Sequence, residues 1–394
     1  MQSFIKISLI LVLFQGGYAK QAQTGHTAPV QDSYIVTLKS STNDNEFDGH
    51  LKEVRNYIDS DQHSSGKNKI KHVYGEVLKG YSAEFTDDVL AKVKAMPEVD
   101  AVEKDQLGKF SSIQTNSSWG LARLSSDSRL PVDNQSFSYN YDPSAGEGVD
   151  VFVIDTGIKT DHPDFQGRAL WGANFIDNSR TDDIGHGTHV AGIIGSDTYG
   201  VAKKATLVAV KMGNATLSAK ASQVIDGVVW AVRNRRKGRG CVINLSLEVK
   251  YSVAFNIAVR NAVRLGCVVV VAAGNGNIDA CNKSPASEPS AITVGASNLD
   301  DKRYEFSNWG QCLDVFAPGE DILSLSTEGD HLDKSGTSMA AAHVSGLAAN
   351  VMSKTGNYNP ADVLEEIIFY SKRGVLTNVG KRSPNLLVSN IGIV

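Results

Sequence analysis

The stretch that decides the fold reads VDVFVI over residues 149–154, and all of it except Asp150 is apolar. Similar short apolar runs recur at 206–210, 242–247 and 268–273. Continuous runs of this kind are typical of parallel strands buried on both faces of a sheet. Segments with helical spacing alternate with them, at 189–195, 222–234, 252–265 and 338–352. The pattern predicts an α/β domain with a mainly parallel sheet and helices on both faces.

A smaller unit precedes this domain. Between about Ser33 and Asp105 the pattern predicts strands and helices in the order βαββαβ, the split βαβ arrangement of a small α+β domain. One strand is expected at 34–38, two strands are expected within 73–85, and a last strand is expected at 99–103. The expected helices lie at 47–58 and 87–96. Residues 106–118 hold few large apolar side chains, so we expect an exposed connector there, which favours cleavage.

The beginning of the chain has the pattern of a signal peptide over residues 1–19. Lys6 supplies a positive charge, residues 7–14 form a short apolar run, and Gly17 and Ala19 are small residues of the kind that a signal peptidase reads. No later stretch reaches the roughly 18 apolar residues that a membrane span requires. We therefore expect an exported protein that has no contact with a membrane after signal removal.

The composition excludes other classes of protein. The 394 residues carry a formal net charge of −4, and 41% of them are hydrophobic. A chain of this kind folds around a sizeable core and is not disordered. It also lacks the strongly basic balance of a nucleic-acid binder, so no nucleic-acid partner is expected.

Four cysteines, Cys241, Cys267, Cys281 and Cys312, all lie in the C-terminal half. An even count behind a signal peptide indicates disulfides, and spacing alone leaves three pairings open. Cys241 and Cys267 begin strands that should be neighbours, which is compatible with a bond between them, although two buried thiols remain an alternative. Zinc is disfavoured, because no close Cys or His pair forms a four-ligand set.

Four polar residues fall at strand ends or helix starts of the α/β domain: Asp155, His186, Asn275 and Ser338. Ligands of parallel α/β sheets bind at the carboxyl ends of the strands, so one edge of the sheet is expected to gather them. Their chemistry is complementary, because an imidazole activates a serine hydroxyl and a buried carboxylate orients the imidazole. An amide donor beside a helix start stabilises a developing oxyanion.

The strings around these residues resemble the subtilisin-like serine proteases, and in particular their proteinase K branch. They read Asp155-Thr156-Gly157, Gly185-His186-Gly187-Thr188-His189, Ala272-Ala273-Gly274-Asn275 and Gly336-Thr337-Ser338-Met339-Ala340. The resemblance implies that Asp155 orients His186, that His186 is the general base and acid, and that Ser338 is the nucleophile. It assigns Asn275 to the oxyanion hole. His189 is expected to be structural, and a metal site on His186 and His189 would need a third ligand.

The same resemblance implies a secreted endopeptidase made as an autoprocessed zymogen. Residues 1–19 would be the signal peptide, 20–111 a propeptide with an inhibitor-like domain at about 33–105, and 112–394 the peptidase domain. The implied partners are protein or peptide substrates and the chain's own propeptide, which acts as an intramolecular inhibitor. The protein is expected to be a monomer. The destination is extracellular, with a vacuole-like compartment as the alternative.

Structural calcium is a further implication of the resemblance, with the carbonyls of Pro289 and Ala291 and the carboxylate of Asp314 as ligands. Oxygen ligands suit this hard cation. The alternative is that Asp314 only caps a turn. Relatives such as aqualysin place a disulfide where Cys281 and Cys312 stand. Possible glycosylation acceptors are Asn116, Asn134, Asn214 and Asn282.

The cleft departs from the family pattern. The expected substrate-binding residues are Ser246, Leu247, Glu248, Ala219 and Gly274. Relatives read Ser-Leu-Gly-Gly where this chain reads Ser-Leu-Glu-Val from residue 246, and glycines are common where it reads Leu-Ser-Ala over 217–219. These changes leave open a second function, that of a catalytically weak homologue that binds peptides or proteins in a modified cleft.

Glu248 itself has two interpretations. Its charge would select Lys or Arg before the scissile bond if the carboxylate faces the substrate. Alternatively the side chain points to solvent and only crowds the cleft, since side chains alternate along a strand.

Overall fold

The computed structural model describes residues 29–60, 67–75, 77–106, 112–131, 136–213 and 219–393. The signal-peptide segment 1–19, the connector residues Lys109, Phe110 and Ser111, and the possible glycosylation acceptors Asn134 and Asn214 lie outside them. No helix in the described part of the chain is long and apolar enough to cross a membrane.

The N-terminal unit has the expected βαββαβ order. Its elements are β1 (Pro29–Leu38), α1 (Asp44–Ser60), β2 (Lys69–Val73), β3 (Gly80–Glu84), α2 (Asp87–Lys94) and β4 (Val99–Gln106). The strands pair antiparallel in the order β2-β3-β1-β4. The first of the two strands expected within 73–85 lies earlier, at β2. This edge strand has mostly exposed side chains and therefore shows no apolar alternation.

The chain passes into the second unit by residue 112. β5 (Ser112–Ser117) pairs antiparallel with β6 (Phe137–Tyr141), with Ser112 opposite Tyr141. Gln114 donates a hydrogen bond to the carbonyl of Thr198 at 2.8 Å, and the Tyr139 hydroxyl donates to that of Val201 at 3.2 Å. Residues from Ser112 onward therefore pack with the second unit.

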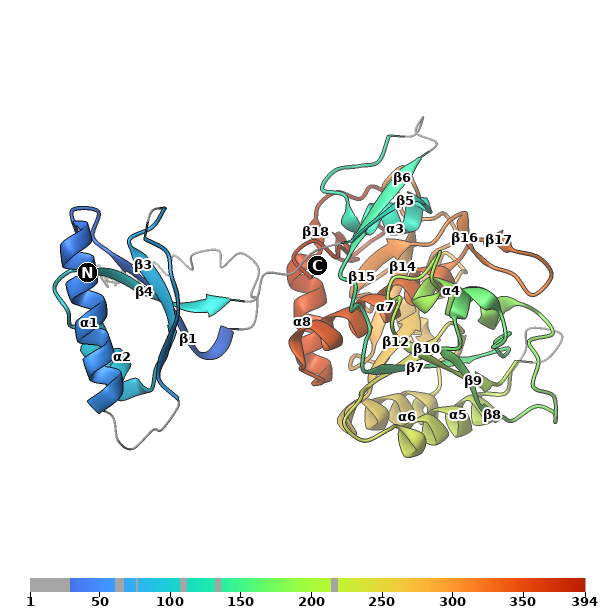
Figure 1. The fold of residues 1–394 in the computed structure, drawn as a ribbon. Coiled ribbons are helices and arrows are strands. Elements are labelled where there is room, and N and C mark those ends of the chain that lie inside the picture. The colour runs from blue at the N-terminus through green and yellow to red at the C-terminus, as the bar shows by residue number, and fades with distance from the viewer. Residues whose placement is uncertain are drawn as a thin grey trace, which may run out of the picture.

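Within the described residues, a nine-stranded sheet forms the centre of the second unit, in the order β18-β19-β15-β14-β12-β10-β7-β9-β8. Its pairs are parallel except β18–β19 (Figure 1). The strands are β7 (Val149–Asp155), β8 (Ala169–Asn174), β9 (Thr206–Lys211), β10 (Gly240–Leu245), β12 (Val268–Ala272), β14 (Ile292–Ser297), β15 (Val315–Pro318), β18 (Lys372–Arg373) and β19 (Leu386–Leu387). β11 (Val249–Lys250) and β13 (Lys283–Ser284), which are distant in sequence, form a small two-stranded sheet, and β16 (Ile322–Leu325) forms a hairpin with β17 (His331–Lys334).

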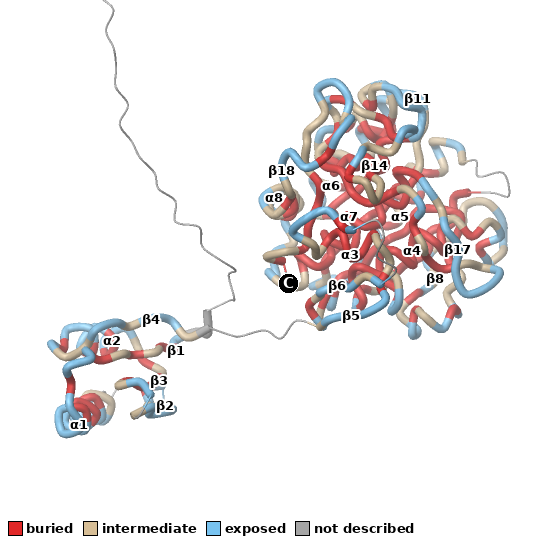
Figure 2. The backbone as a smooth tube through the Cα atoms, turned by 90° about the horizontal axis from the view of Figure 1, so that it is seen from above, coloured by how far each residue is buried: buried red, intermediate tan, exposed pale blue. Residues whose placement is uncertain are grey.

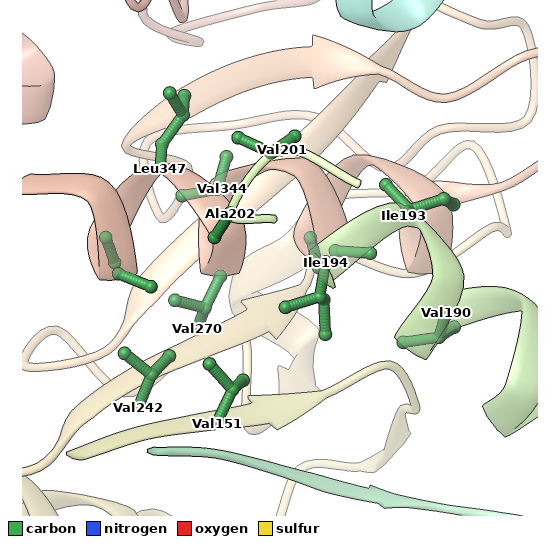
Figure 3. Packing of buried hydrophobic residues seen from close by; sticks show 14 of the residues in the cluster. Val151, Val190, Ile193, Ile194, Val201, Ala202, Val242, Val270, Val344 and Leu347 are labelled. Carbon is green, nitrogen blue, oxygen red and sulfur yellow. The ribbon is translucent and has the colours of Figure 1, made fainter. Parts of the chain in front are cut away.

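Helices cover both faces of this sheet, as predicted. They are α3 (Trp119–Ser125), α4 (His186–Gly195), α5 (Ala221–Asn234), α6 (Val253–Arg264), α7 (Thr337–Thr355) and α8 (Pro360–Tyr370), with short 3₁₀ turns at Pro163–Phe165 and Ala280–Asn282. The parallel strands, buried on both faces, alternate their side chains between two cores. Val151, Val242 and Val270 pack with α4 and α7 on one face (Figure 3). Phe152 and Ile243 pack with α5 and α6 on the other face.

The helix α7 runs through the middle of the unit. Every residue from Thr337 to Met352 is buried, and the buried segments gather around it (Figure 2). A helix that is apolar or small all round belongs in a core and not on a surface. Its burial fixes its first turn, and with it Ser338, at the carboxyl edge of the sheet.

The structure contains both disulfides, Cys241–Cys267 and Cys281–Cys312. Cys241 lies in β10 and Cys267 directly precedes β12, with the two Cα atoms 4.7 Å apart. The parallel register pairs Val242 with Val268, one residue further along each strand. This bond therefore ties together the starts of two strands whose ends form the site described below.

We predict that replacing both Cys241 and Cys267 by alanine lowers the free energy of unfolding by about 2–4 kcal/mol, because the closed loop no longer restricts the unfolded chain. Urea unfolding of the purified double variant and of the parent protein measures the difference. Equal midpoints and slopes for the two proteins would show that this bond adds nothing to stability.

Candidate active site

Asp155 and His186 form a hydrogen-bonded pair at the carboxyl edge of the sheet. Asp155 is the last residue of β7, and His186 is the first residue of α4. The Oδ1 atom of Asp155 lies 2.7 Å from Nδ1 of His186 and accepts the backbone N–H of Thr156 at the same distance. Asp155 is buried, whereas the His186 side chain keeps 18% of its surface exposed. The imidazole is thus fixed from one side and accessible from the other.

Burial in the protein and the nearby Asp155 carboxylate shift the pKa of His186 in opposite directions. Burial lowers the pKa of His186, but the Asp155 carboxylate raises it by more, so that it lies above the ordinary value of 6.5. The result is a ring that takes up a proton more readily than a free histidine while remaining in one orientation.

Ser338 lies in the first turn of α7, beside the end of β10. Its Oγ donates to the carbonyl of Ser246 at 3.2 Å, and the Oγ of Ser246 donates to the carbonyl of Ser338 at 3.0 Å. The hydroxyl is therefore bonded to the backbone and not to the His186 ring. Catalytic hydrogen bonds are often long or poorly aligned before substrate binds, so this geometry is compatible with a nucleophile.

Asn275 presents an amide donor next to Ser338. Its Oδ1 accepts the backbone N–H of Thr337 at 2.9 Å and the Thr337 hydroxyl at 3.1 Å, which assigns the amide orientation and leaves Nδ2 as the donor. The backbone N–H of Ser338 lies in the first turn of α7, where such groups have no partner within the helix. Asn275, which is exposed, and the start of α7 thus each provide a donor at this edge of the sheet.

His189 does not share the environment of His186. It is fully buried, and its Nε2 lies 2.8 Å from the carbonyl of Leu332 and 3.0 Å from that of Ile322. Burial lowers the pKa of His189 to about 4, so the ring is neutral. It joins α4 to the β16–β17 hairpin.

Several residues that support the site were not found from the sequence. Asp182 is buried and accepts five hydrogen bonds, from the Thr156 hydroxyl, the N–H groups of Ile184 and Gly185, and the N–H and hydroxyl of Thr188. It thereby fixes the first turn of α4, and its place shortly before that helix was the available signal. Thr337, which holds Asn275, had no such signal, because its partner is 62 residues away.

Ser246 and Leu247 follow the end of β10, and Gly274 follows the end of β12, so the structure brings these expected substrate-binding residues to the same edge. Ala219 lies half-buried against the core of α5 and α6. Leu217 and Ser218 lie outside the described residues.

Glu248 is not isolated in solvent. Its carboxylate accepts a hydrogen bond from Nζ of Lys283 at 2.9 Å, and the other oxygen lies 3.4 Å from Nδ2 of Asn308. The side chain is 31% exposed and that of Lys283 is 22% exposed. The charge that the sequence places in the cleft is therefore paired with a cation.

Asp314 lies at the start of β15 with one oxygen accepting the backbone N–H of Thr293 at 2.8 Å. Burial raises the pKa of Asp314 to about 6, and no ion pair with it occurs among the described residues. Pro289 is exposed and Ala291 is buried just before β14. Over the described ranges no three His, Cys, Asp or Glu side chains gather in a metal-binding group, so a cation here would depend on backbone carbonyls.

Comparison with known proteins places this geometry in a family. Residues 146–385 match the model of the subtilase family, and residues 33–111 match that of the peptidase inhibitor I9 family. The chain belongs to the subtilase family. Subtilisin-like protease 1 of Arthroderma gypseum is 40% identical to this subtilase over 403 residues, which cover 99% of this chain and 82% of that protein. A subtilisin-like protease of Coccidioides posadasii is 40% identical over 377 residues, covering 92% of each chain.

A solved structure agrees with these sequence matches. The crystal structure of a cold-adapted subtilisin-like serine proteinase aligns with a TM-score of 0.65 at 39% identity, covering 70% of this chain and 98% of that one. The subtilase is thus a serine endopeptidase, and its N-terminal unit is an inhibitor-type propeptide domain.

The pH dependence of this enzyme should follow His186. The ring must be neutral to accept a proton, so kcat/KM is expected to rise with pH through an inflection above 6.5. Replacing Asp155 by asparagine removes the carboxylate that raises this pKa. The inflection should then move to lower pH, and the plateau should fall by about 10⁴-fold through the wrong ring tautomer.

The matched control is Asp161→Asn, which removes an exposed carboxylate near the same edge and should leave the profile unchanged. Steady-state cleavage of a fluorogenic peptide between pH 5 and 10 gives both profiles. An unshifted inflection in Asp155→Asn would separate Asp155 from the titration of His186.

Proposed function

We propose that this subtilase is a secreted zymogen in which Ser338 is the nucleophile, His186 the general base and acid, and Asp155 its orienting carboxylate. Asn275 and the backbone N–H of Ser338 are the oxyanion donors. The observation that carries the proposal is the 2.7 Å contact between a buried carboxylate and a partly exposed imidazole at the carboxyl edge of the sheet, where Ser338 lies in the first turn of α7.

The chemistry follows from these positions. Oγ of Ser338 attacks the carbonyl carbon of the scissile peptide, and Nε2 of His186 takes the hydroxyl proton. The carbonyl oxygen becomes an oxyanion between Nδ2 of Asn275 and the Ser338 N–H. His186 then gives its proton to the departing amine, which leaves an acyl-enzyme. Water, activated by the same ring, hydrolyses the ester and restores the serine.

The Asp155 carboxylate stabilises the imidazolium at each of these steps and remains ionised itself. Because Thr156 donates its backbone N–H to the same oxygen that faces His186, the carboxylate keeps its direction when the ring gains its proton.

The chain is proposed to mature by its own activity. The signal peptide comprises residues 1–19, the propeptide 20–111 and the mature enzyme 112–394. The boundary is supported by the end of β4 at Gln106 and the pairing of Ser112 with Tyr141 in the second unit. The propeptide acts as intramolecular inhibitor, the substrates are proteins or peptides, and the enzyme is a secreted monomer. Asn116 and Asn282 are exposed acceptors for glycans.

Ser338→Ala should accumulate the uncleaved chain that begins near Lys20, because the nucleophile that removes the propeptide is lost. Ser353→Ala, near the far end of the same helix, should be processed normally. Intact-mass measurement of both proteins from a host lacking other proteases gives the result. Active enzyme added in trans should cleave the accumulated chain only near residue 111 and leave a product of the mature mass, which shows that the rest of the chain is folded. Normal processing of Ser338→Ala alone would refute self-cleavage.

A calcium ion is proposed at Asp314, with the carbonyls of Pro289 and Ala291. A buried carboxylate with a raised pKa and no ion-pair partner in the described parts of the chain fits a cation. Oxygen donors from one carboxylate and the backbone are the ligands that calcium accepts. The bound ion would hold the start of β14 to the start of β15.

Removing calcium with a chelator should lower the Tm, since a ligand at 100 times its Kd stabilises the folded state by about 2.7 kcal/mol. In Asp314→Asn the Tm should no longer respond to calcium, whereas Glu305→Gln, an exposed carboxyl variant, should respond as the parent does. Differential scanning calorimetry of inhibited protein avoids self-digestion. A full calcium response in Asp314→Asn would place the ion elsewhere.

A further inference from the structure

The position of the substrate's side chain follows from the proposed roles of Ser338 and Asn275, on which this inference rests. An attacked carbonyl lies at Oγ of Ser338 with its oxygen toward Asn275. Ser246 contacts Ser338 on one side, and Gly274 directly precedes Asn275 on the other. The side chain before the scissile bond must therefore enter between the segment 246–248 and the segment 273–275.

Glu248 occupies this space. A Cβ atom built on Gly274 would lie 1.8 Å from Oε2 of Glu248 and 2.4 Å from Nδ2 of Asn308. The carboxylate thus lies directly against the one residue of the opposite wall that has no side chain. Gly274 has a φ of +100°, a conformation that also favours glycine. The close approach is possible only because this position is glycine.

Strand pairing holds the backbone at Glu248 and Lys283 in place, and hydrogen bonds to the backbone hold the Asn308 side chain. Lys283 opens β13, whose strand pairs with β11, and β11 begins directly after Glu248. Asn308 is fully buried and is held by its own bonds to Ala273, Gly276 and Ile278 at 2.7–3.0 Å. A large substrate side chain would have to displace an ion pair from a framework that has little freedom to move.

We propose that the Glu248–Lys283 ion pair is a specificity clamp that closes this pocket to large side chains. The enzyme then cleaves after small uncharged residues such as Gly, Ala and Ser. Lys283 neutralises Glu248, so the pair does not attract Lys or Arg in the way that a lone carboxylate would. The clamp limits size, and its cation suppresses the charge preference that Glu248 would otherwise impose.

Two variants separate these roles. In Glu248→Gly the pocket is open, and the ratio of kcat/KM for Phe over Ala before the scissile bond should rise at least about tenfold. In Lys283→Gln the carboxylate loses the cation that holds it and can turn toward an incoming Lys or Arg, so the ratio for Lys or Arg over Ala should rise by a similar factor. Only the second gain should shrink at high salt, which screens charges.

Lys250→Gln is the matched control, because Lys250 lies opposite Lys283 in the β11–β13 pair and is exposed. It should leave every ratio unchanged. Peptide-library cleavage by the mature enzymes supplies the ratios. Parent enzyme that cleaves after Phe or Leu as well as after Ala, or that prefers Lys and Arg, would overturn the clamp. An unchanged profile in Glu248→Gly would do the same.

Binding measurements keep the clamp testable apart from catalysis. Product peptides that end in Ala, Phe or Lys are titrated into Ser338→Ala protein freed of its propeptide, with and without Glu248→Gly. The clamp is supported if Ser338→Ala protein binds the peptide ending in Ala most tightly and the double variant binds the peptide ending in Phe most tightly. This result holds even if the assignment of the nucleophile fails. Equal affinities in both proteins refute the clamp even if Ser338 proves to be the nucleophile.

Discussion

The burial of α7 against one face of the sheet is the constraint on which the rest of the structure depends. This helix packs along the strands through small side chains such as Ala341 and Ala348, and a Cβ on Gly346 would lie 2.6 Å from that of Val201. Ser345 donates to Asn244 of β10 at 2.8 Å, and Asn244 donates to Ser246 at 2.9 Å. The first turn of the helix therefore has one possible place, at the ends of β10 and β12. The positions of the proposed nucleophile and of its two proposed oxyanion donors follow from that place.

Charges at this edge are buried only where a partner compensates them. Asp155 has His186 and a backbone N–H, and Asp182 is satisfied by five donors. Glu248 has Lys283. A buried carboxylate without such partners would cost several kcal/mol or become protonated. Asp314 is the contrasting case, because it has a single backbone donor and a raised pKa. This contrast is why a cation is proposed there and not at the other three carboxylates.

The sequence alone predicted those features of the fold and site that depend on residues close together in the chain. The apolar runs of β7, β10 and β12 predicted the parallel sheet, and the strings around Asp155, His186, Asn275 and Ser338 identified the family. Edge strand β2 has exposed side chains, so periodicity located it too late. β14 reads ITVGAS, in which Thr, Gly and Ser interrupt the apolar run, and β15 has only four residues, so periodicity revealed neither. Glu248 was recognised as a departure from the family, but its orientation depends on Lys283, 35 residues away. Contacts between distant segments leave no local pattern to read.

The central claim is that Ser338, activated by His186, is the nucleophile of this subtilase. A fluorophosphonate probe reacts with a serine whose proton is removed by a neighbouring base. Mass spectrometry of peptides from the labelled mature enzyme shows which residue carries the adduct. The account predicts one adduct on Ser338, with labelling that decreases as His186 becomes protonated at low pH. An adduct on another residue, or no adduct in correctly processed enzyme, would contradict it.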